Sequence, residues 1–437
     1  MNLQRKFFQI TCVSPVHVGN GETLKSFEYL YERKTGTVYF VDEAKWIAFL
    51  HANNLTDDFY AYVQKFSANI NRREQFAEKN VWEGLNERGI DYADIRNLAI
   101  RQAAAETNTI ESKRTLNDID CHIALPNAQA YIPGSTLKGL FRTAILHAKL
   151  KQSPELCRRY WKRISATADS DLRRRNNECL KISRELENEI LARLDYSAAE
   201  RFNRRIPNEI KSVLRGLMVS DAICTETVDA VILQRTDATT KINYRGETEK
   251  TLPLFCECIP AHTKLRFSVT LDFDMLKLID ITTFDQIFQM TREFFFEVLE
   301  RLEEVFGQNF PQQFDEARTA DSLLGGGVGF LAKSLLYSLA PSHEAARAWA
   351  VNYFDKAFTV WNFNARRHEP AHWHETYDQQ ISPRTLKLKR SQTGASIVDS
   401  FNLRSRRNAE AYSVQIDPDT RRKNKLVDVF AFPRRLD

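Results

Sequence analysis

The chain of 437 residues is long enough for about two or three domains. Its 43% hydrophobic and 27% charged residues are typical of a globular protein. No run of about 18 apolar residues occurs, which argues against a membrane span, and the N-terminal segment lacks the apolar core of a signal peptide. The seven cysteines are scattered, odd in number and without a C-x-x-C pair, so free thiols in a reducing cytoplasm are expected.

Positive charge is concentrated near the C-terminal end. The net charge is +5, but residues 381–437 hold 13 Lys/Arg and 6 Asp/Glu, so the first 380 residues are slightly acidic. A basic end on a nearly neutral body favours a polyanionic ligand, and nucleic acid is the usual one. A solvated basic tail without a ligand is the alternative.

The predicted elements follow an α+β order, with strands separated by helical stretches. Alternating apolar residues predict strands, and apolar residues at helical spacing predict helices. Strands are predicted at 6–13, 217–223, 230–236 and 264–273, and a hairpin at 27–42 with its turn at Lys34–Gly36. Helices are predicted at 43–51, about 56–110, 136–150, 154–216, 283–307 and 342–358. The 283–307 helix opens with a Thr283/Gln286 capping box, and the last 55 residues are expected to be extended or irregular.

Four of the 15 glycines lie within five positions of the segment LLGGGVGFLAKSLL, residues 323–336. Each glycine in an ordered element costs roughly 0.5–1 kcal/mol relative to alanine, so their concentration needs a reason. Successive N–H groups without side chains form concavities that bind anions. A helix predicted directly after the loop, with Lys333 near its start, would add its dipole.

Two further loops have a similar composition. A Pro-Gly-Ser-Thr turn at 133–136 opens a helix that carries Lys138 and Arg142 on one face, and residues 17–22 place two glycines beside a histidine. Most turn glycines serve only the turn. Three such loops together with a basic tail indicate a ligand whose phosphate backbone passes over several loops.

Other motifs were weighed and set aside. The H-E-x-x-H pattern at 368–372 contains Pro370, and proline inside a helix costs about 3 kcal/mol, so a zinc protease is not expected. The G-x-G-x-x-A pattern at 327–332 lacks the preceding strand of a dinucleotide site. No metal or cofactor is predicted from the sequence.

Three segments resemble the motifs of the RAMP superfamily of CRISPR-associated RNA-binding proteins. They are SPVHVGNGE (14–22), AYIPGSTLKGLFRTAIL (130–146) and GGGVGFLAKSLL (325–336). The segment ISPRTLKL (381–388) is similar to one typical of the subunit-five family of the type III-A (Csm) effector. The resemblance spans about residues 6–390.

The resemblance implies an α+β fold of two ferredoxin-like (RRM-like) modules with antiparallel sheets. The first would span 1–260, with helical insertions at about 56–115 and 150–215. The second would span 261–437, with the glycine-rich loop and the basic tail. The helical insertions themselves match no known motif.

The resemblance also implies a function. It predicts a non-catalytic, cytoplasmic subunit that binds the 3′ end of the guide crRNA, caps the filament of backbone RAMP subunits and supports crRNA 3′-end maturation in antiviral defence. The implied partners are crRNA, the backbone RAMP subunit, the small helical subunit and recruited cellular nucleases, without a membrane.

The residues expected to bind RNA follow from the loop chemistry and the resemblance together. Phe330 would either stack on a base or pack in the core, and His17 would either contact a phosphate or 2′-OH or be a buried structural residue. RNA bound in this way is read by shape rather than by sequence. The full set is His17, Gly19, Gly21, Gly134, Ser135, Lys138, Arg142, Gly325, Gly326, Gly327, Gly329, Phe330, Lys333, Arg384, Lys387 and Lys389.

Three other functions stay open. A RAMP-type crRNA-processing endoribonuclease would need a general base, an acid and a cation, for which His17, Tyr131 and Lys138 have suitable chemistry. However, non-cleaving superfamily members share the motif that holds His17, and the chain is longer than a minimal processing enzyme, so no catalytic activity is expected. A RAMP subunit of a type III-B effector and a scaffold without RNA contact are the other two.

Overall fold

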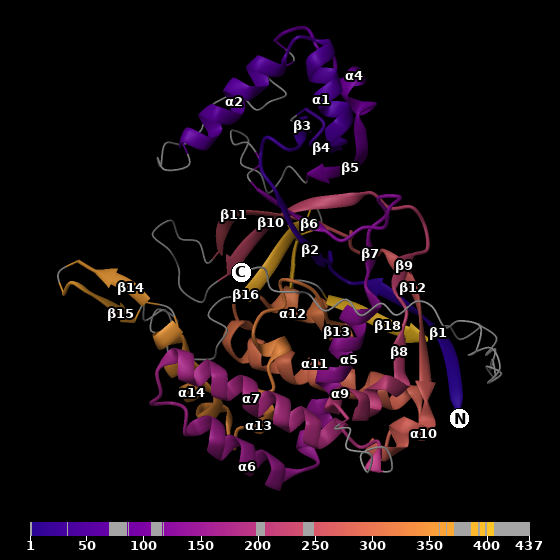
Figure 1. The fold of residues 1–437 in the computed structure, drawn as a ribbon, viewed down its shortest axis with the longest axis vertical. Coiled ribbons are helices and arrows are strands. Elements are labelled where there is room, and N and C mark those ends of the chain that lie inside the picture. The colour runs from indigo at the N-terminus through magenta and orange to yellow at the C-terminus, as the bar shows by residue number, and fades with distance from the viewer. Residues whose placement is uncertain are drawn as a thin grey trace.

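The computed structural model describes most of the chain. The described residues are 2–32, 34–69, 85, 87–105, 116, 118–197, 206–238, 249–357, 359–363, 365–370, 386–391, 394–397 and 400–405. The fold is of mixed helix and sheet, with two large sheets and a separate two-stranded ribbon (Figure 1). The α+β class expected from the sequence is confirmed.

The first sheet joins strands from both ends of the chain, in the order β13–β18–β1–β12–β9–β7, with β8 also paired to β12. Its pairs are all antiparallel. The long central pair β1–β12 runs in register from Leu3 opposite Asp272 to Thr11 opposite Lys264. The strands are β1 (Leu3–Cys12), β7 (Tyr131–Ile132), β8 (Leu217–Val219), β9 (Ala222–Cys224), β12 (Lys264–Asp272), β13 (Ser322–Leu323) and β18 (Ser400–Ser405).

Two long helices, α5 (Gly134–Lys151) and α11 (Phe284–Phe306), pack together over this sheet (Figure 1). The predicted capping box at the start of α11 is present: the Thr283 side chain accepts from Gln286 N, and the Gln286 side chain accepts from Thr283 N. Phe8 on β1 contacts Phe288 on α11, with ring centroids 4.6 Å apart. Burial of these apolar faces gives the main core.

The second sheet is mixed, in the order β2–β6–β11–β10–β5–β4–β3, with β16 and β17 added on β10. The β10–β5 and β11–β6 pairs are parallel. Both large sheets take strands from both sides of residue 260, so the predicted division at 260/261 does not separate the sheets. The strands are β2 (Gly19–Leu24), β3 (Leu30–Glu32), β4 (Thr37–Val41), β5 (Ala99–Ala105), β6 (Ile119–His122), β10 (Ala230–Ala238), β11 (Glu249–Cys258), β16 (Leu386–Ser391) and β17 (Gly394–Ile397).

Several of the remaining helices lie at the two ends of the molecule. Figure 1 shows α1, α2 and α4 beside β3–β5 at one end, and α6, α7, α13 and α14 at the other. Among the residues that the structure describes, no helix combines the length and the apolar character needed to cross a membrane. The elements are α1 (Glu43–Ala52), α2 (Thr56–Asn69), α4 (Tyr92–Arg96), α6 (Pro154–Ser165), α7 (Leu172–Leu191), α9 (Asn208–Lys211), η2 (Val213–Gly216), α10 (Phe273–Leu276), η3 (Lys277–Ile279), α12 (Pro311–Ala317), η4 (Leu331–Lys333), α13 (Leu336–Leu339), α14 (His343–Ala357), β14 (Thr359–Asn362) and β15 (Arg367–Pro370).

The prediction of one helical stretch over 56–110 is wrong. Residues 99–105 form β5, which lies between β4 and β10 in the second sheet. Alanine favours a helix, but Ala103 and Ala105 alternate with exposed residues, and small side chains fit the buried face of a sheet. Tertiary pairing here overrides a helix propensity of well under about 1 kcal/mol per residue.

The helix expected directly after the glycine loop does not form as a continuous element. A three-residue 3₁₀ helix, η4, ends at Lys333, and the four-residue α13 follows. Helices this short have little macrodipole, so that part of the anion-binding argument loses its force. Residues 368–370 of the H-E-x-x-H pattern lie in strand β15, not in the helix that a zinc protease site needs, and the rest lies outside the described residues.

Candidate nucleic-acid interface

The loop after β1 meets the glycine loop through the backbone of His17. The N–H of Gly326 donates to the carbonyl oxygen of His17 at 3.0 Å. A Cβ atom at Gly326 would lie 3.2 Å from His17 Cδ2, and one at Gly19 would lie 3.2 Å from His17 Nε2. The absence of side chains at both glycines therefore makes room for the imidazole. Two motifs that are about 300 residues apart in the sequence are therefore in direct contact.

The second motif reaches the same place through a groove of about 840 Å³, called here the glycine-loop groove. It is lined by α5, α7, α14 and the loop between β13 and α13. Five residues expected to bind RNA line this groove: Arg142, Gly326, Gly329, Phe330 and Lys333. Parts of the second and third motifs thus line one groove, and the first motif is joined to it by the hydrogen bond from Gly326 to His17.

Lys138 and Arg142 share a face of α5 but differ in electrostatic surroundings. Lys138 is half-buried, and burial lowers its pKa; no acidic group is paired with it within the described residues. Arg142 is held by Glu187 of α7 through two hydrogen bonds, with Nε 2.6 Å from Oε1. An anionic ligand would therefore gain more electrostatic binding energy from Lys138 than from Arg142.

A carboxylate of the same chain, Asp221, already accepts a hydrogen bond from the N-terminus of α5. The N–H of Gly134 donates to Asp221 Oδ1 at 2.7 Å, and a Cβ at Gly134 would lie only 2.3 Å from the carbonyl oxygen of Val219. Packing against the β8–β9 connection is thus a sufficient reason for glycine at this position. Ser135, the next residue, is exposed.

The glycines of the loop are not equivalent. Gly325 and Gly329 have positive φ values of 132° and 77°, whereas Gly326 does not. Within 4 Å of a Cβ built at Gly329 there is no atom. Phe330 is half-buried and packs edge-to-face on Phe354, with ring centroids 5.7 Å apart. That contact favours the core role over base stacking for this side chain.

The remaining predicted residues are placed as follows. Gly21 has a positive φ of 92° in open space. Lys387 and Lys389 lie in β16, opposite Asp237 and Arg235 of β10. Arg384 lies outside the described residues.

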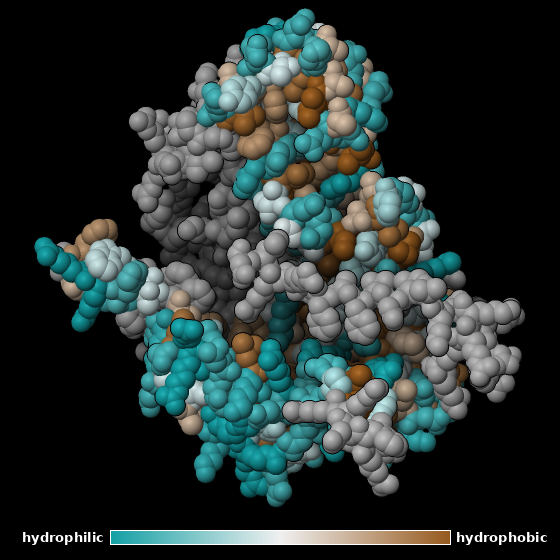
Figure 2. Space-filling model, viewed as in Figure 1, coloured by the Kyte–Doolittle hydropathy of each residue, from teal (hydrophilic) through white to brown (hydrophobic). Residues whose placement is uncertain are grey.

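Two arginines of α6 form ion pairs with acidic residues of α7. Arg159 pairs with Glu189, and Arg163 pairs with Glu178 and Glu185. Figure 2 shows this end of the molecule as a mostly hydrophilic surface. Paired, exposed charges of this kind give a solvated helical face, so these arginines are weaker phosphate candidates than Lys138.

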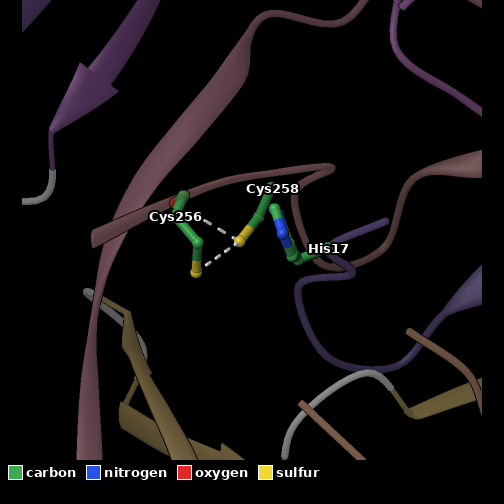
Figure 3. Close-up of side chains that lie close together, drawn as sticks. All are labelled: His17, Cys256 and Cys258. Atoms are coloured by element: carbon green, nitrogen blue, oxygen red, sulfur yellow. Dashed lines mark hydrogen bonds between the residues drawn. The ribbon is translucent and has the colours of Figure 1, made fainter. Parts of the chain in front are cut away.

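Sequence reasoning missed several residues that shape the site. Asp221 caps α5, and Glu187 holds Arg142; both are acidic residues far along the chain from their partners. Cys256 and Cys258 lie beside His17 in Figure 3. Only the two cysteines left a sequence signal, since positions i and i+2 of a strand face the same side.

The class that fold and site define is an α+β protein whose glycine-rich loop lines a groove together with the basic helix α5. The sequence profile of the RAMP superfamily matches residues 9–317, which is more than half of the chain. The chain belongs to the RAMP superfamily. The expected membership of this superfamily is confirmed, and the match includes the first two of the three motifs.

Curated relatives sharpen this assignment. "CRISPR system Cms protein Csm5" of Mycobacterium tuberculosis (strain ATCC 25618 / H37Rv) is 26% identical over 287 residues, which cover 62% of this chain and 68% of that protein. The protein of the same name from Streptococcus thermophilus is 24% identical over 263 residues, covering 60% of this chain and 62% of that protein. The expected likeness to subunit five of the type III-A effector is thereby confirmed.

A solved structure shares the fold. One chain in a cryo-EM structure of a Csm–crRNA–target RNA ternary complex of a type III-A CRISPR-Cas system aligns with a TM-score of 0.59 and 18% identity. The alignment covers 92% of this chain and all of that chain. At this identity the likeness establishes the fold alone.

Proposed function

We propose that this protein is a non-catalytic, crRNA-binding subunit of a type III-A CRISPR effector complex. In this proposal it binds the 3′ end of the guide, caps the filament of backbone RAMP subunits and supports 3′-end maturation by recruited nucleases. Its partners are crRNA, the backbone subunit and the small helical subunit, and it works in the cytoplasm. Support comes from the relatives named Csm5 and from the complex that contains the structural neighbour.

The observation that carries the proposal is the convergence of the three motifs. The Gly326–His17 backbone hydrogen bond joins two of them, and Arg142 of the third lines the glycine-loop groove. Lys138 adds a half-buried cation on the same helix face. An RNA backbone supplies phosphates at regular intervals and suits such a surface.

The fold supports one of the two expected ferredoxin-like modules. If β1, β9, β12 and β18 are numbered one to four along the chain, their order in the sheet is four, one, three, two (β18–β1–β12–β9), and all three pairs are antiparallel. Helix α5 falls between the first and second strands, and α11 between the third and fourth. We infer that this sheet and its two helices form a split βαβ module of the ferredoxin-like type.

A binding role without catalysis is supported by the surroundings of His17. Its Nδ1 lies 2.7 Å from the carbonyl oxygen of Glu257, and its ring lies against Gly19 and Gly326. These contacts give His17 a part in organising the two loops, and we infer that this is its role rather than proton transfer. Incubating the purified chain with labelled guide RNA in the absence of metal tests this. Retention without cleavage is expected, and cleavage at a fixed site would identify a processing endoribonuclease instead.

Lys138→Ala tests the RNA-binding surface directly. If Lys138 neutralises one phosphate, its loss should reduce the slope of log K against log salt by about 0.7. Arg142→Ala should change the slope less, because Arg142 is already paired with Glu187. The measurement is a filter-binding or anisotropy titration of guide RNA at several salt concentrations.

Lys149→Ala is the matched control, because Lys149 lies on the same helix and pairs with Asp280. Its salt slope should equal that of the unmodified chain. An unchanged slope in Lys138→Ala would remove Lys138 from the interface, and equal slopes in all three variants would contradict the proposed surface.

A further inference from the structure

A cluster of soft ligand atoms includes His17, the residue whose carbonyl oxygen accepts from Gly326 of the glycine loop. One ring nitrogen of His17 and the sulfurs of Cys256 and Cys258 lie within 4.8 Å of one another (Figure 3). The two sulfurs are 3.5 Å apart. Among the described residues, this is the one group of three or more His, Cys, Asp or Glu side chains with ligand atoms this close.

The local sequence explains why the two thiols meet. Cys256 and Cys258 belong to β11, and alternate residues of a strand project from the same face. The loop that follows β1 brings His17 to this strand, where Val16 and Ile259 pair as an isolated bridge. The three ligands are therefore fixed by sheet pairing rather than by mobile side chains alone.

The distances suit a tetrahedral metal ion. With Zn–S of about 2.3 Å, two thiolates on one zinc ion are about 3.8 Å apart, and with Zn–N of about 2.0 Å a thiolate and an imidazole nitrogen are about 3.5 Å apart. The observed sulfur separation of 3.5 Å is already close to that geometry. A rotation of His17 or of a cysteine by a small angle closes the rest.

The hydrogen bond of His17 is of the kind that metal-ligating histidines make. Nδ1 of His17 lies 2.7 Å from the carbonyl oxygen of Glu257, which can only accept, so Nδ1 is the donor in this bond. Metal-bound histidines usually donate their other ring N–H to a carboxylate or backbone carbonyl, which fixes ring orientation and basicity. His17 and Cys256 are half-buried, which leaves a path for the ion, while Cys258 is buried.

We propose that His17, Cys256 and Cys258 form a binding site for a borderline-soft divalent metal ion, Zn²⁺ in a reducing cytoplasm. Two thiolates and one imidazole favour zinc over the hard cations Mg²⁺ and Ca²⁺. The fourth position is available to water. Because the carbonyl of His17 accepts from Gly326, the ion holds the glycine loop on β11. The inference does not depend on RNA binding, since its primary readout is metal content.

The first test measures metal in the full-length chain. The protein is stripped with a chelator under reducing conditions, reloaded with ZnCl₂, desalted and analysed by mass spectrometry of the elements. About one zinc ion per chain is expected, with a rise in melting temperature on loading, because a ligand that binds only the folded state stabilises it. Retention of no zinc after loading would overturn the proposal.

Variants locate the ion. Cys256→Ser, Cys258→Ser and His17→Gln should each lower zinc occupancy by more than half and abolish the zinc-dependent rise in melting temperature. Cys157→Ser is the matched control, because this thiol is half-buried in α6 and donates to backbone carbonyl oxygens. The zinc content of this variant should equal that of the unmodified chain. Full zinc occupancy in the Cys256→Ser/Cys258→Ser double variant would show binding elsewhere and refute the site.

A third measurement needs no variant and so does not depend on variants folding. Co²⁺ loaded in place of zinc should give the intense sulfur-to-cobalt charge-transfer absorption of thiolate ligands in a tetrahedral spectrum. Loss of RNA binding with normal cobalt spectra would count against the proposed function and not against the metal site. A cobalt spectrum without thiolate bands, or a Cys256–Cys258 disulfide that persists in reductant, would overturn the metal site.

Discussion

The start of α5 and the glycine loop both place glycine where the sequence suggested a phosphate cradle, yet they need glycine for different reasons. At Gly134 a side chain would collide with the backbone of the β8–β9 connection. At Gly329 the surroundings are open, but φ is +77°. One position is limited by space and the other by backbone conformation. Glycine content alone therefore does not show that a ligand approaches the chain.

The largest effect is expected from Gly134→Ala. Its Cβ would lie 2.3 Å from Val219 O and 2.7 Å from the carbonyl carbon of Ser220, and backbone atoms cannot move aside cheaply. Forcing an extra methyl into such packing should lower the free energy of unfolding by about 3 kcal/mol. Urea denaturation followed by circular dichroism measures it.

Gly139→Ala is the control on the same helix, since no atom lies within 4 Å of a Cβ at that position. Alanine in a helix interior should raise stability by up to about 1 kcal/mol. Equal unfolding free energies for the two variants would mean that α5 shifts to accept the methyl group. Space would then not be what requires glycine at the start of α5, in contrast to the explanation given above.

A smaller effect is expected at Gly329. An L-residue in the left-handed region costs about 1–2 kcal/mol, and asparagine tolerates it better than alanine. Gly329→Ala should therefore lower the melting temperature, and Gly329→Asn should recover part of the loss. The melting temperatures of both variants, measured by thermal denaturation, test this. If the asparagine variant melts below the alanine variant, space rather than backbone conformation limits this position as well.

The smallest effect is expected at Gly326, which has no positive φ. Its Cβ would lie 3.2 Å from Cδ2 of His17, a side-chain atom that can shift by a few tenths of an ångström. We expect Gly326→Ala to lower the unfolding free energy by less than about 1 kcal/mol. The close approach that the sequence attributes to RNA at this position is made by the chain's own histidine.

A double-mutant cycle with His17→Ala sharpens this point. If the methyl acts through the imidazole, the two changes should be non-additive by about 0.5 kcal/mol or more, because contacting residues couple. Additive effects would mean that Gly326 is limited by something other than His17, and an RNA backbone would regain its place as the reason for glycine there.

The sequence by itself determined the strongly periodic elements and the family. The alternating apolar residues in 264–273 predict β12, and the capping box at Thr283 predicts the start of α11. Both signals are local, so they can be recognised without knowing which other segment packs against them. The three motifs were sufficient to indicate the RAMP superfamily. The strand β5 was missed because its alanines carry a helix preference that only pairing with β4 and β10 overrides.

Only the tertiary structure decided which residues meet. It placed Gly326 against His17 and Asp221 against the N–H of Gly134. It also paired Arg142 with Glu187, whereas Lys138 on the same helix face has no acidic partner among the described residues. It also brought Cys256 and Cys258 to His17, about 240 residues away. Such contacts depend on sheet register and helix packing across the whole chain, which no local pattern encodes.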